Sequence, residues 1–375
     1  MKRIAILHSG DLNNVSIGGV SQYIQEIIRH EERYSVVLYG TCEAGTHKIG
    51  EHYTYEIDKK EYTFIPITDN SKSPLSIYYF FNLKKYYTEI EKCDVIYCQR
   101  MEYILPFWGR KSKKKTVMAV HGSGAYTAIW RGKTVAFIYD ILERIAVSIS
   151  GKVIVLQKRD EFGVPYYKRK YARYADKIYY GRVPVDEKVF YKLENKENEN
   201  SHIKKVLYLG RIDDNPKRVL LFPSIAERLK DSGYAFQFIL IGDGTSMDNL
   251  VSEIHEKGLD DTFTLMGKIE HGPALTCLLN SGDVALIISA FEGICMSALE
   301  CIACGVPVVA TDVGDIKEYI KNGENGIIIP NDNNVINNAA EAVIKIFNNG
   351  CPMNKVYQKY SAQNMIDELE SIFGK

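Results

Sequence analysis

The chain has 375 residues, which is too long for one hydrophobic core and predicts two domains of ordinary size. A hydrophobic content of 46% and a charged content of 25% are typical of a soluble globular protein. No apolar run approaches the length of about 18 residues needed to cross a bilayer, and the start turns polar too early for a signal peptide. We therefore expect a cytoplasmic protein.

The net charge is zero but unevenly distributed. Residues 1–180 carry 28 Lys+Arg against 19 Asp+Glu, which favours an anionic partner for this half. Two basic stretches with interleaved aromatic residues supply the excess: 107–115 (FWGRKSKKK) and 165–174 (PYYKRKYARY). Such stretches can lie on an anionic membrane, at the inner face of the membrane for a cytoplasmic protein, or remain solvated. Nucleic acid is the least favoured partner.

Strand-like and helical stretches alternate through the first half, which predicts one Rossmann-like α/β domain. Helices are expected at 21–30 and around 79–91 and 134–148. Strands are expected at 3–8, 34–38, 62–67, 95–98, 116–121, 152–156 and 177–180. The loops near 40–75 look polar and irregular.

Two positions in this half are candidate site positions. Gly18 and Gly19 precede the first helix, where the backbone can approach a phosphate at the helix N-terminus. A plain flexible turn explains the pair equally well. His121 ends a strand and is followed by glycine, at the carboxyl edge where parallel sheets bind ligands.

A second domain opens after the charged linker 194–202, with a strand at 205–209. Arg211 and Lys217 follow that strand and precede a helix at 219–230. Two cations at this position can neutralise the charge that grows on a diphosphate leaving group, and Arg can do so through two parallel hydrogen bonds. Further strands are expected at 236–241 and 263–266, followed by turns at Gly242 and Gly267–Ile269.

The segment 284–311 carries the strongest signal. Strands at 284–288 and 307–310 flank a loop with Glu292 and a helix at 296–304 that contains Glu300. If helical throughout, the two glutamates lie roughly 12 Å apart. A carboxylate can accept hydrogen bonds from two sugar hydroxyls, and the helix start between the glutamates offers N–H groups to a phosphate. These features together indicate a nucleotide-sugar site.

Glu292-x7-Glu300, followed by CIACGVPVVATDVG, resembles the signature of the retaining family 4 glycosyltransferases (glycosyltransferase group 1). The resemblance implies the α/β GT-B fold, with two Rossmann-like β/α/β domains facing across a cleft. The acceptor-binding domain would be 1–185, completed by a returning C-terminal helix at 356–373, with acceptor recognition expected in the loops near 40–75. The donor-binding domain would be 186–355, with a last strand at 326–329.

The resemblance implies retaining transfer from a nucleotide-diphosphate sugar to a hydroxyl of a glycan or lipid-linked acceptor, in cell-surface polysaccharide or glycolipid synthesis. Arg211 and Lys217 would stabilise the departing diphosphate. Glu292 would hold the donor sugar, Glu300 the ribose, and His121 would complete the sugar pocket. Other positions implied to line the donor site are Gly18, Gly19, Gly242, Ile269, Gly293, Ile294, Cys295 and Met296.

Some features depart from the family pattern. Arg211 and Lys217 stand six apart, one more than the commonest spacing, so Arg218 is an alternative to Lys217. The residues after Gly293 differ from the usual ones, so neither the sugar nor the base (UDP, GDP or ADP) can be carried over. No Asp-x-Asp box is present, and we expect metal-independent transfer without a cofactor. The alternatives are a nucleotide-sugar 2-epimerase and a non-catalytic nucleotide-sugar-binding partner of a transferase.

Overall fold

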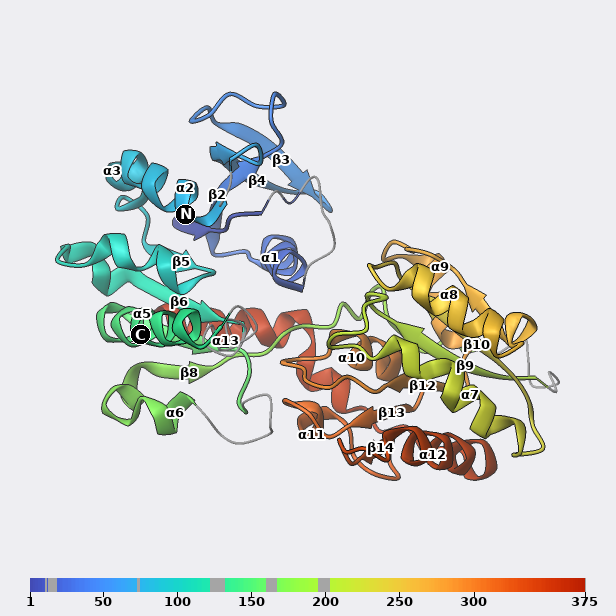
Figure 1. The fold of residues 1–375 in the computed structure, drawn as a ribbon. Helices are drawn as coiled ribbons and strands as arrows, with labels where there is room; N and C mark the ends of the chain where they lie inside the picture. Colours follow the sequence, from blue (N-terminus) through green and yellow to red (C-terminus); the bar gives the residue numbers. More distant parts are fainter. Residues whose placement is uncertain are drawn as a thin grey trace. The chain divides into compact units, whose positions relative to one another are not determined.

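A computed structural model describes residues 1–10, 12, 19–72, 75–121, 132–159, 167–194 and 203–374. The chain divides into two compact units (Figure 1). Unit 1 comprises Met1–Lys158, Pro165–Pro184 and Ala362–Lys375. Unit 2 comprises Arg159–Val164 and Val185–Ser361.

Unit 1 contains an eight-stranded sheet in the order β3-β4-β2-β1-β5-β6-β7-β8, parallel except for β3. Its strands are β1 (Lys2–Leu7), β2 (Tyr34–Cys42), β3 (Tyr53–Ile57), β4 (Lys60–Asp69), β5 (Val95–Cys98), β6 (Thr116–Val120), β7 (Lys152–Val155) and β8 (Ile178–Tyr180). Its α-helices are α1 (Gly19–His30), α2 (Leu75–Leu83), α3 (Tyr87–Ile90), α5 (Lys133–Ile149), α6 (Tyr167–Lys170) and α13 (Ala362–Gly374). Short 3₁₀ helices are η1 (Lys84–Tyr86), η2 (Met101–Tyr103), η3 (Leu105–Phe107), η4 (Lys111–Lys115) and η5 (Ala172–Lys177).

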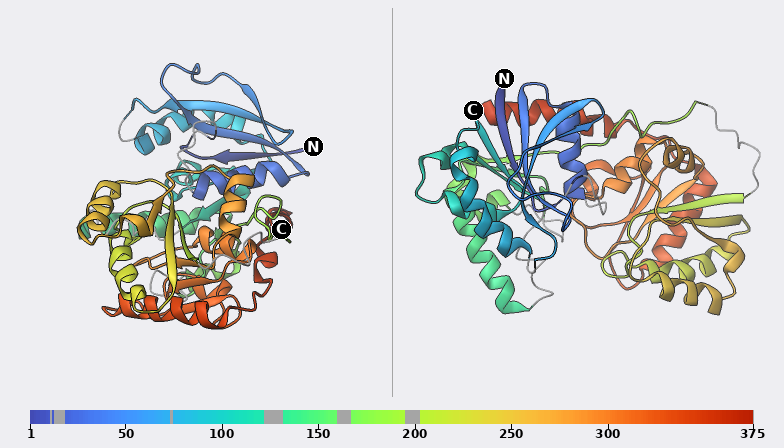
Figure 2. Two further views of the ribbon diagram at one scale, coloured as in Figure 1. Left: turned by 90° about the vertical axis from the view of Figure 1, so that its right-hand side faces the viewer. Right: turned by 90° about the horizontal axis from the view of Figure 1, so that it is seen from above.

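Helices cover both faces of the unit 1 sheet, as the near-continuous burial of its central strands requires (Figure 2). On one face, Tyr79 of α2 and Ala146 of α5 belong to the same buried cluster as Ala5 of β1. The other face is covered by α1 and α13. Phe373 of α13 contacts Tyr34 of β2 and Tyr97 of β5. The C-terminal helix is therefore part of the unit 1 core.

Unit 2 contains a six-stranded, fully parallel sheet in the order β11-β10-β9-β12-β13-β14. Its strands are β9 (Ile203–Leu209), β10 (Ala235–Ile241), β11 (Phe263–Leu265), β12 (Val284–Ile287), β13 (Val308–Thr311) and β14 (Gly326–Ile329). Its α-helices are α7 (Phe222–Lys230), α8 (Met247–Glu256), α9 (Pro273–Asn280), α10 (Met296–Ala303), α11 (Ile316–Tyr319) and α12 (Val335–Asn349). Its 3₁₀ helices are η6 (Val219–Leu221), η7 (Asp260–Thr262) and η8 (Val356–Tyr360). One face packs against α7, α8 and α12, and the other against α9 and α10.

Two expectations about local structure are wrong. The region 40–75 is not irregular, because β3 and β4 form an antiparallel hairpin there. Its turn residues Asp58 and Lys59 both have positive φ, as a tight hairpin turn requires. The expected helix at 356–373 is two elements, because Ser361 is extended between η8 and α13 and forms a bridge with Val185.

Candidate active site

The strand order of unit 2 reverses between β9 and β12. From β9 the chain adds β10 and β11 on one side of the sheet, then crosses to add β12, β13 and β14 on the other. Open α/β sheets bind ligands at the carboxyl ends of the strands at such a point. The loops that follow β9 and β12 carry Arg211, Lys217 and Glu292. The fold therefore brings the predicted cations and carboxylate to one edge of the sheet.

Lys217 and Glu292 form a half-buried ion pair. Lys217 Nζ lies 2.5 Å from Glu292 Oε1, and Ser289 Oγ donates to the same oxygen at 2.7 Å. Thr311 Oγ1 of β13 donates to the Ser289 carbonyl at 2.6 Å and so fixes the start of this loop. Burial lowers the pKa of Lys217, but the charge of Glu292 outweighs it and leaves the pKa above its ordinary value. Lys217 is therefore a cation at neutral pH.

The alternative cation, Arg218, points elsewhere. Its backbone is left-handed, with φ of +54°, and its Nη1 donates to Asn331 Oδ1 at 2.8 Å. Asn331 Nδ2 in turn donates to the Ala290 carbonyl, and the Ala290 N–H donates to the Pro216 carbonyl. These bonds tie the two loops together, with Lys217 turned toward Glu292 and Arg218 away from it.

Arg211 does not join this ion pair. Its Nη1 donates to Asp213 Oδ2 at 2.6 Å, and its side chain is largely exposed. Asp213 is itself held, because its Oδ1 accepts from the Thr245 N–H and hydroxyl. Arg211 thus stands at the same strand end as Lys217 with a solvent-accessible guanidinium.

Glycines allow three neighbouring loops to approach closely at this edge. A Cβ on Gly242, whose φ is +143°, would lie 1.8 Å from the Gly210 carbonyl oxygen. The Gly242 N–H donates to the Gly267 carbonyl at 2.8 Å. The predicted residue Ile269 follows and packs half-buried against the core of unit 2.

The segment after Glu292 is held by its own backbone. The Gly293 carbonyl accepts from the Asp315 N–H, and the Cys295 N–H donates to the buried Tyr319 hydroxyl. Ile294 and Met296 are half-buried, whereas Cys295 is buried. Burial raises the pKa of the Cys295 thiol to about 11, so this thiol is no nucleophile at neutral pH.

Glu300 lies inside α10 and is only 4% exposed. Burial raises the pKa of its carboxyl to about 8. The imidazole Nε2 of His271 lies 3.9 Å from Glu300 Oε1, which is beyond hydrogen-bond distance. The distance of roughly 12 Å expected from the sequence requires a helix from Glu292 to Glu300. The helix α10 begins only at Met296, so the first part of this segment is not helical.

His121 belongs to unit 1. It follows β6, and its Nε2 lies 2.8 Å from Gln99 Oε1, with Tyr23 edge-on to the ring. Burial, helped by His8, lowers the pKa of His121 to about 3, so the ring is neutral at physiological pH. Gly19 opens α1 and is exposed, whereas Gly18 lies outside the described residues.

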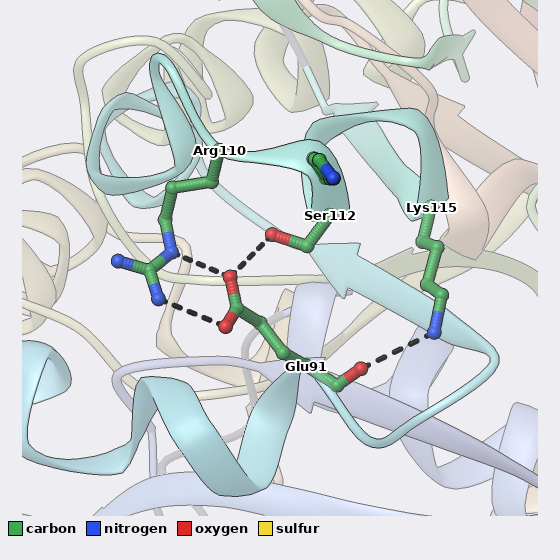
Figure 3. Close-up of a pocket in the computed structure, with 5 residues that line it drawn as sticks. Glu91, Arg110, Ser112 and Lys115 are labelled. Carbon is green, nitrogen blue, oxygen red and sulfur yellow. Dashed lines mark hydrogen bonds and ion pairs between the residues drawn. The ribbon is translucent and has the colours of Figure 1, made fainter.

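The basic stretch 107–115 forms a separate, open pocket of about 560 Å³ (Figure 3). Arg110 is bound to Glu91 through two hydrogen bonds of 2.5 and 2.8 Å, and Ser112 Oγ donates to the same carboxylate. Arg110 and Ser112 together lower the pKa of Glu91 to about 2. Lys115 donates to the Glu91 carbonyl. Since η4 directly precedes β6, this pocket lies at the amino edge of the sheet, opposite His121.

Sequence reasoning missed Ser289, Asn331, His271 and Gln99. Ser289 and Gln99 were detectable, because each lies within two residues of the carboxyl end of a buried strand. Asn331 meets the same criterion, because it is the second residue after β14. His271 was recognisable only by its proximity to Glu300 in the folded chain, and no spacing marks it.

Residues 203–349 match the family model described as "Glycosyl transferases group 1". A 125-residue stretch is 32% identical to alpha-D-kanosaminyltransferase of Streptomyces kanamyceticus and covers 33% of this chain and 32% of that protein. The chain thus spans about a third of the length of this curated relative.

Two solved structures share the fold over nearly the full length. Sucrose-phosphate synthase from Thermosynechococcus elongatus has a TM-score of 0.75 at 18% identity, covering 99% of this chain and 95% of that one. HepE from Anabaena, solved in complex with UDP and glucose, has a TM-score of 0.69 at 13% identity and covers both chains completely. The expected α/β GT-B fold with two Rossmann-like domains is confirmed, and residues 203–349, less than half of the chain, match the group 1 glycosyl transferases.

Proposed function

We propose that the protein is a retaining glycosyltransferase that moves a sugar from a nucleoside-diphosphate sugar to a hydroxyl of a glycan or lipid-linked acceptor. The observation that carries this proposal is the Lys217–Glu292 ion pair at the reversal of strand order in unit 2. A donor of this class brings a diphosphate for the cation and sugar hydroxyls for the carboxylate.

Each site residue has a proposed role. Lys217 and Arg211 neutralise the diphosphate as it departs, which is where negative charge grows in the transition state. Glu292 accepts hydrogen bonds from the sugar hydroxyls and Glu300 from those of the ribose. The glycine loops at Gly242 and Gly293 leave room for the nucleotide, and His121 contributes a neutral imidazole to the sugar pocket.

The proposed reaction takes place on one face of the sugar. The bond from the anomeric carbon to the diphosphate oxygen breaks, and a bond to the acceptor oxygen forms on the same face. The acceptor proton passes to the departing diphosphate, so no enzyme carboxylate has to act as nucleophile. Retaining glycosidases, by contrast, need two carboxyl groups about 5–5.5 Å apart.

The comparisons support the donor class by analogy. The Anabaena protein of the same fold was solved with UDP and glucose, and the Streptomyces relative is named for transfer of an amino sugar. We extend this analogy to a nucleoside-diphosphate sugar for the present chain, and to a setting in cell-surface polysaccharide or glycolipid synthesis.

The test needs no knowledge of the acceptor. Water can take the place of the acceptor hydroxyl, so hydrolysis of UDP-, GDP- and ADP-sugars is followed by proton NMR. Release of the α-sugar from an α-linked donor before mutarotation supports retaining transfer, and release of the β-sugar contradicts it. Unchanged rates in EDTA support metal independence, whereas loss restored by Mn²⁺ or Mg²⁺ contradicts it. Conversion of the donor sugar to its 2-epimer would identify the protein as the epimerase. Nucleotide binding without turnover would identify it as the non-catalytic partner.

We also propose that unit 1 contacts an anionic membrane surface. Among the described residues, no helix is both long and apolar enough to span a bilayer. The exposed cations Lys111, Lys113 and Lys114 and the exposed ring of Trp108 support peripheral contact by the stretch 107–115. In the stretch 165–174, Tyr167 and Tyr171 are buried and donate to Glu143, so these rings do not reach a membrane.

A further inference from the structure

Four neighbouring strands of unit 1 end in neutral polar side chains. His8, Gln99 and His121 directly follow β1, β5 and β6, and Gln157 is the second residue after β7. These strands are adjacent and parallel, so their carboxyl ends share one edge, with about 4.8 Å between neighbours. The strand order of unit 1 also reverses beside β1, which is where such sheets bind ligands.

Three nitrogen atoms in this row are buried without a partner. Gln99 and Gln157 are each 3% exposed and His8 is 9% exposed. Within the part of the chain that the structure describes, no hydrogen-bond partner exists for Gln99 Nε2, Gln157 Nε2 or His8 Nδ1. The bond from His121 Nε2 to Gln99 Oε1 sets the orientation of that amide and leaves its NH₂ group unused. Buried polar groups are normally paired, so three unpaired ones in a row require an explanation.

The row carries no formal charge. Burial lowers the pKa of His8 to about 4, as it lowers that of His121 to about 3, so both rings are neutral at physiological pH. Two described cations follow the row in sequence: Arg100 is engaged by Glu102 through a hydrogen bond of 2.5 Å, and Lys158 is not free either. The side chains of the row supply no cation for a phosphate or carboxylate, whereas a hydroxyl can both accept from an amide NH₂ and donate to an imidazole nitrogen.

We propose that His8, Gln99 and Gln157 form a binding row for a neutral sugar ring on unit 1. The inference rests on the proposed function and names the class of sugar that unit 1 recognises, an uncharged one. From β1 to β7 the row extends about 14 Å, which is longer than one sugar ring. The sugar is that of the acceptor or of the donor, and the experiment separates these two sources.

The experiment measures ligand binding to the full-length protein by saturation-transfer NMR. The neutral probes are methyl α-D-glucoside and maltose, and the charged probes are glucose 1-phosphate and inorganic phosphate. We expect Gln99→Leu and Gln157→Leu each to weaken neutral-sugar binding about two- to tenfold, the effect of losing one hydrogen bond. The matched control is Gln363→Leu, in the exposed part of α13, where the amide donates to Asp367 and binding should not change.

The melting temperature distinguishes a binding row from a structural one. Gln157→Leu removes an unpaired, desolvated donor, so we expect this ligand-free variant to melt at the same temperature or higher. Gln99→Leu also loses the hydrogen bond to His121 and should melt lower, so the stability criterion applies to Gln157→Leu. Weaker binding without loss of stability supports the proposal. A lower melting temperature with unchanged sugar binding overturns it, because the amides then hold structural water. Preferential binding of the charged probes, or no binding of any neutral probe, also overturns it.

UDP and UDP-glucose are measured on the same proteins. If only UDP-glucose binding weakens in the variants while UDP and the free glycosides are unaffected, the row holds the donor sugar. If the free glycosides weaken, it holds the acceptor sugar. If the variants bind UDP-glucose and the free glycosides as the natural protein does, the proposed row is contradicted. UDP binding and donor turnover in the same proteins would still support the proposed function. Sugar binding that depends on Gln99 in a protein that binds no nucleotide supports the row and contradicts the transferase.

Discussion

Lys217 Nζ lies 2.5 Å from Glu292 Oε1, although 75 positions separate the two residues. Each residue is at the end of a loop that follows one of the two strands flanking the reversal of strand order. In the ligand-free protein each charge therefore neutralises the other. Under the proposed function, a bound donor offers both groups a better partner, the diphosphate to the cation and the sugar hydroxyls to the carboxylate.

The first prediction concerns Lys217→Met, which removes the cation and keeps most of the side-chain volume. We expect kcat for donor turnover to fall about 100- to 1,000-fold, the usual loss when one group that stabilises a developing anion is deleted. The measurement is release of nucleoside diphosphate under saturating donor. Arg218→Met is the matched control, since Arg218 contacts Asn331 instead of Glu292. Equal losses in both variants would contradict the role assigned to Lys217.

The second prediction separates the two glutamates. Glu292→Ala should abolish transfer with the nucleotide still bound, because this carboxylate is assigned to the sugar. Glu300→Ala should weaken nucleotide binding, because that carboxylate is assigned to the ribose. Calorimetric titration with UDP, GDP and ADP measures nucleotide binding in both variants, and release of nucleoside diphosphate measures donor turnover. Transfer that survives in Glu292→Ala, or nucleotide binding that is lost there, would show that the roles are assigned wrongly.

The strand-end rule explains how much of the site was predictable. Buried apolar runs marked most strands to within two residues, and in a parallel sheet the loops after them meet at one edge. Lys217 and Glu292 could therefore be placed together from sequence. The choice between Lys217 and Arg218 could not, because it depends on the left-handed backbone of Arg218 and on its contact with Asn331.

Other features depend on contacts that no local pattern contains. The ion pair of Arg211 with Asp213 and the hydrogen bond between Gln99 and His121 both form only after the chain folds. The β3–β4 hairpin, in contrast, was readable from its alternating pattern around Asp58. It was missed because that turn lacks the glycine that usually marks such hairpins.

The third prediction concerns pH. Burial raises the pKa of Glu300 to about 8, whereas in the unfolded chain the carboxyl titrates near its ordinary value of 4.5. Between these values the folded state retains a proton that the unfolded state has released. Rising pH therefore favours unfolding through this group, by at most about 1.4 kcal/mol per pH unit.

Glu300→Gln removes this effect, because the amide is neutral at every pH. We expect the melting temperature of the variant, relative to that of the natural protein, to rise steadily from about pH 5 to about pH 8. Scanning calorimetry at several pH values measures this difference. A constant difference would mean that a nearby group such as His271, 3.9 Å away, holds Glu300 ionised in the folded state.

The fourth prediction tests the close approach of the glycine loops. In Gly242→Ala the new Cβ would meet the Gly210 carbonyl at 1.8 Å, and the φ of +143° is strained for any other residue. We expect unit 2 to lose about 3 to 5 kcal/mol of stability from overpacking and strain together. Gly258→Ala is the control, with φ of +60° and nothing within 4 Å of the added Cβ, and should cost only about 1–2 kcal/mol. Equal costs would exclude the close approach as the cause.

The fifth prediction concerns the membrane surface proposed for unit 1. Each exposed lysine near an anionic bilayer contributes about 1 kcal/mol, and the attraction weakens as salt screens it. Replacing three exposed lysines by glutamine should therefore reduce co-sedimentation with vesicles containing phosphatidylglycerol about 100-fold at low salt; the three are Lys111, Lys113 and Lys114. The matched control replaces three exposed lysines of unit 2 and should bind like the natural protein; these are Lys188, Lys230 and Lys345.

The same assay decides which edge of unit 1 meets the bilayer. The lysines of η4 lie at the amino edge of the sheet, whereas the N-terminal half of α5 leads toward the edge that carries His121 and exposes Phe137 at 65% together with Ile138 and Ile141. A bilayer held at the η4 lysines alone would leave a lipid-linked acceptor at the wrong edge of the sheet. If Phe137→Ser lowers vesicle binding and the triple lysine variant does not, the membrane lies beside α5, within reach of the site. If neither variant changes binding, the exposed cations are solvated and a soluble glycan becomes the favoured acceptor.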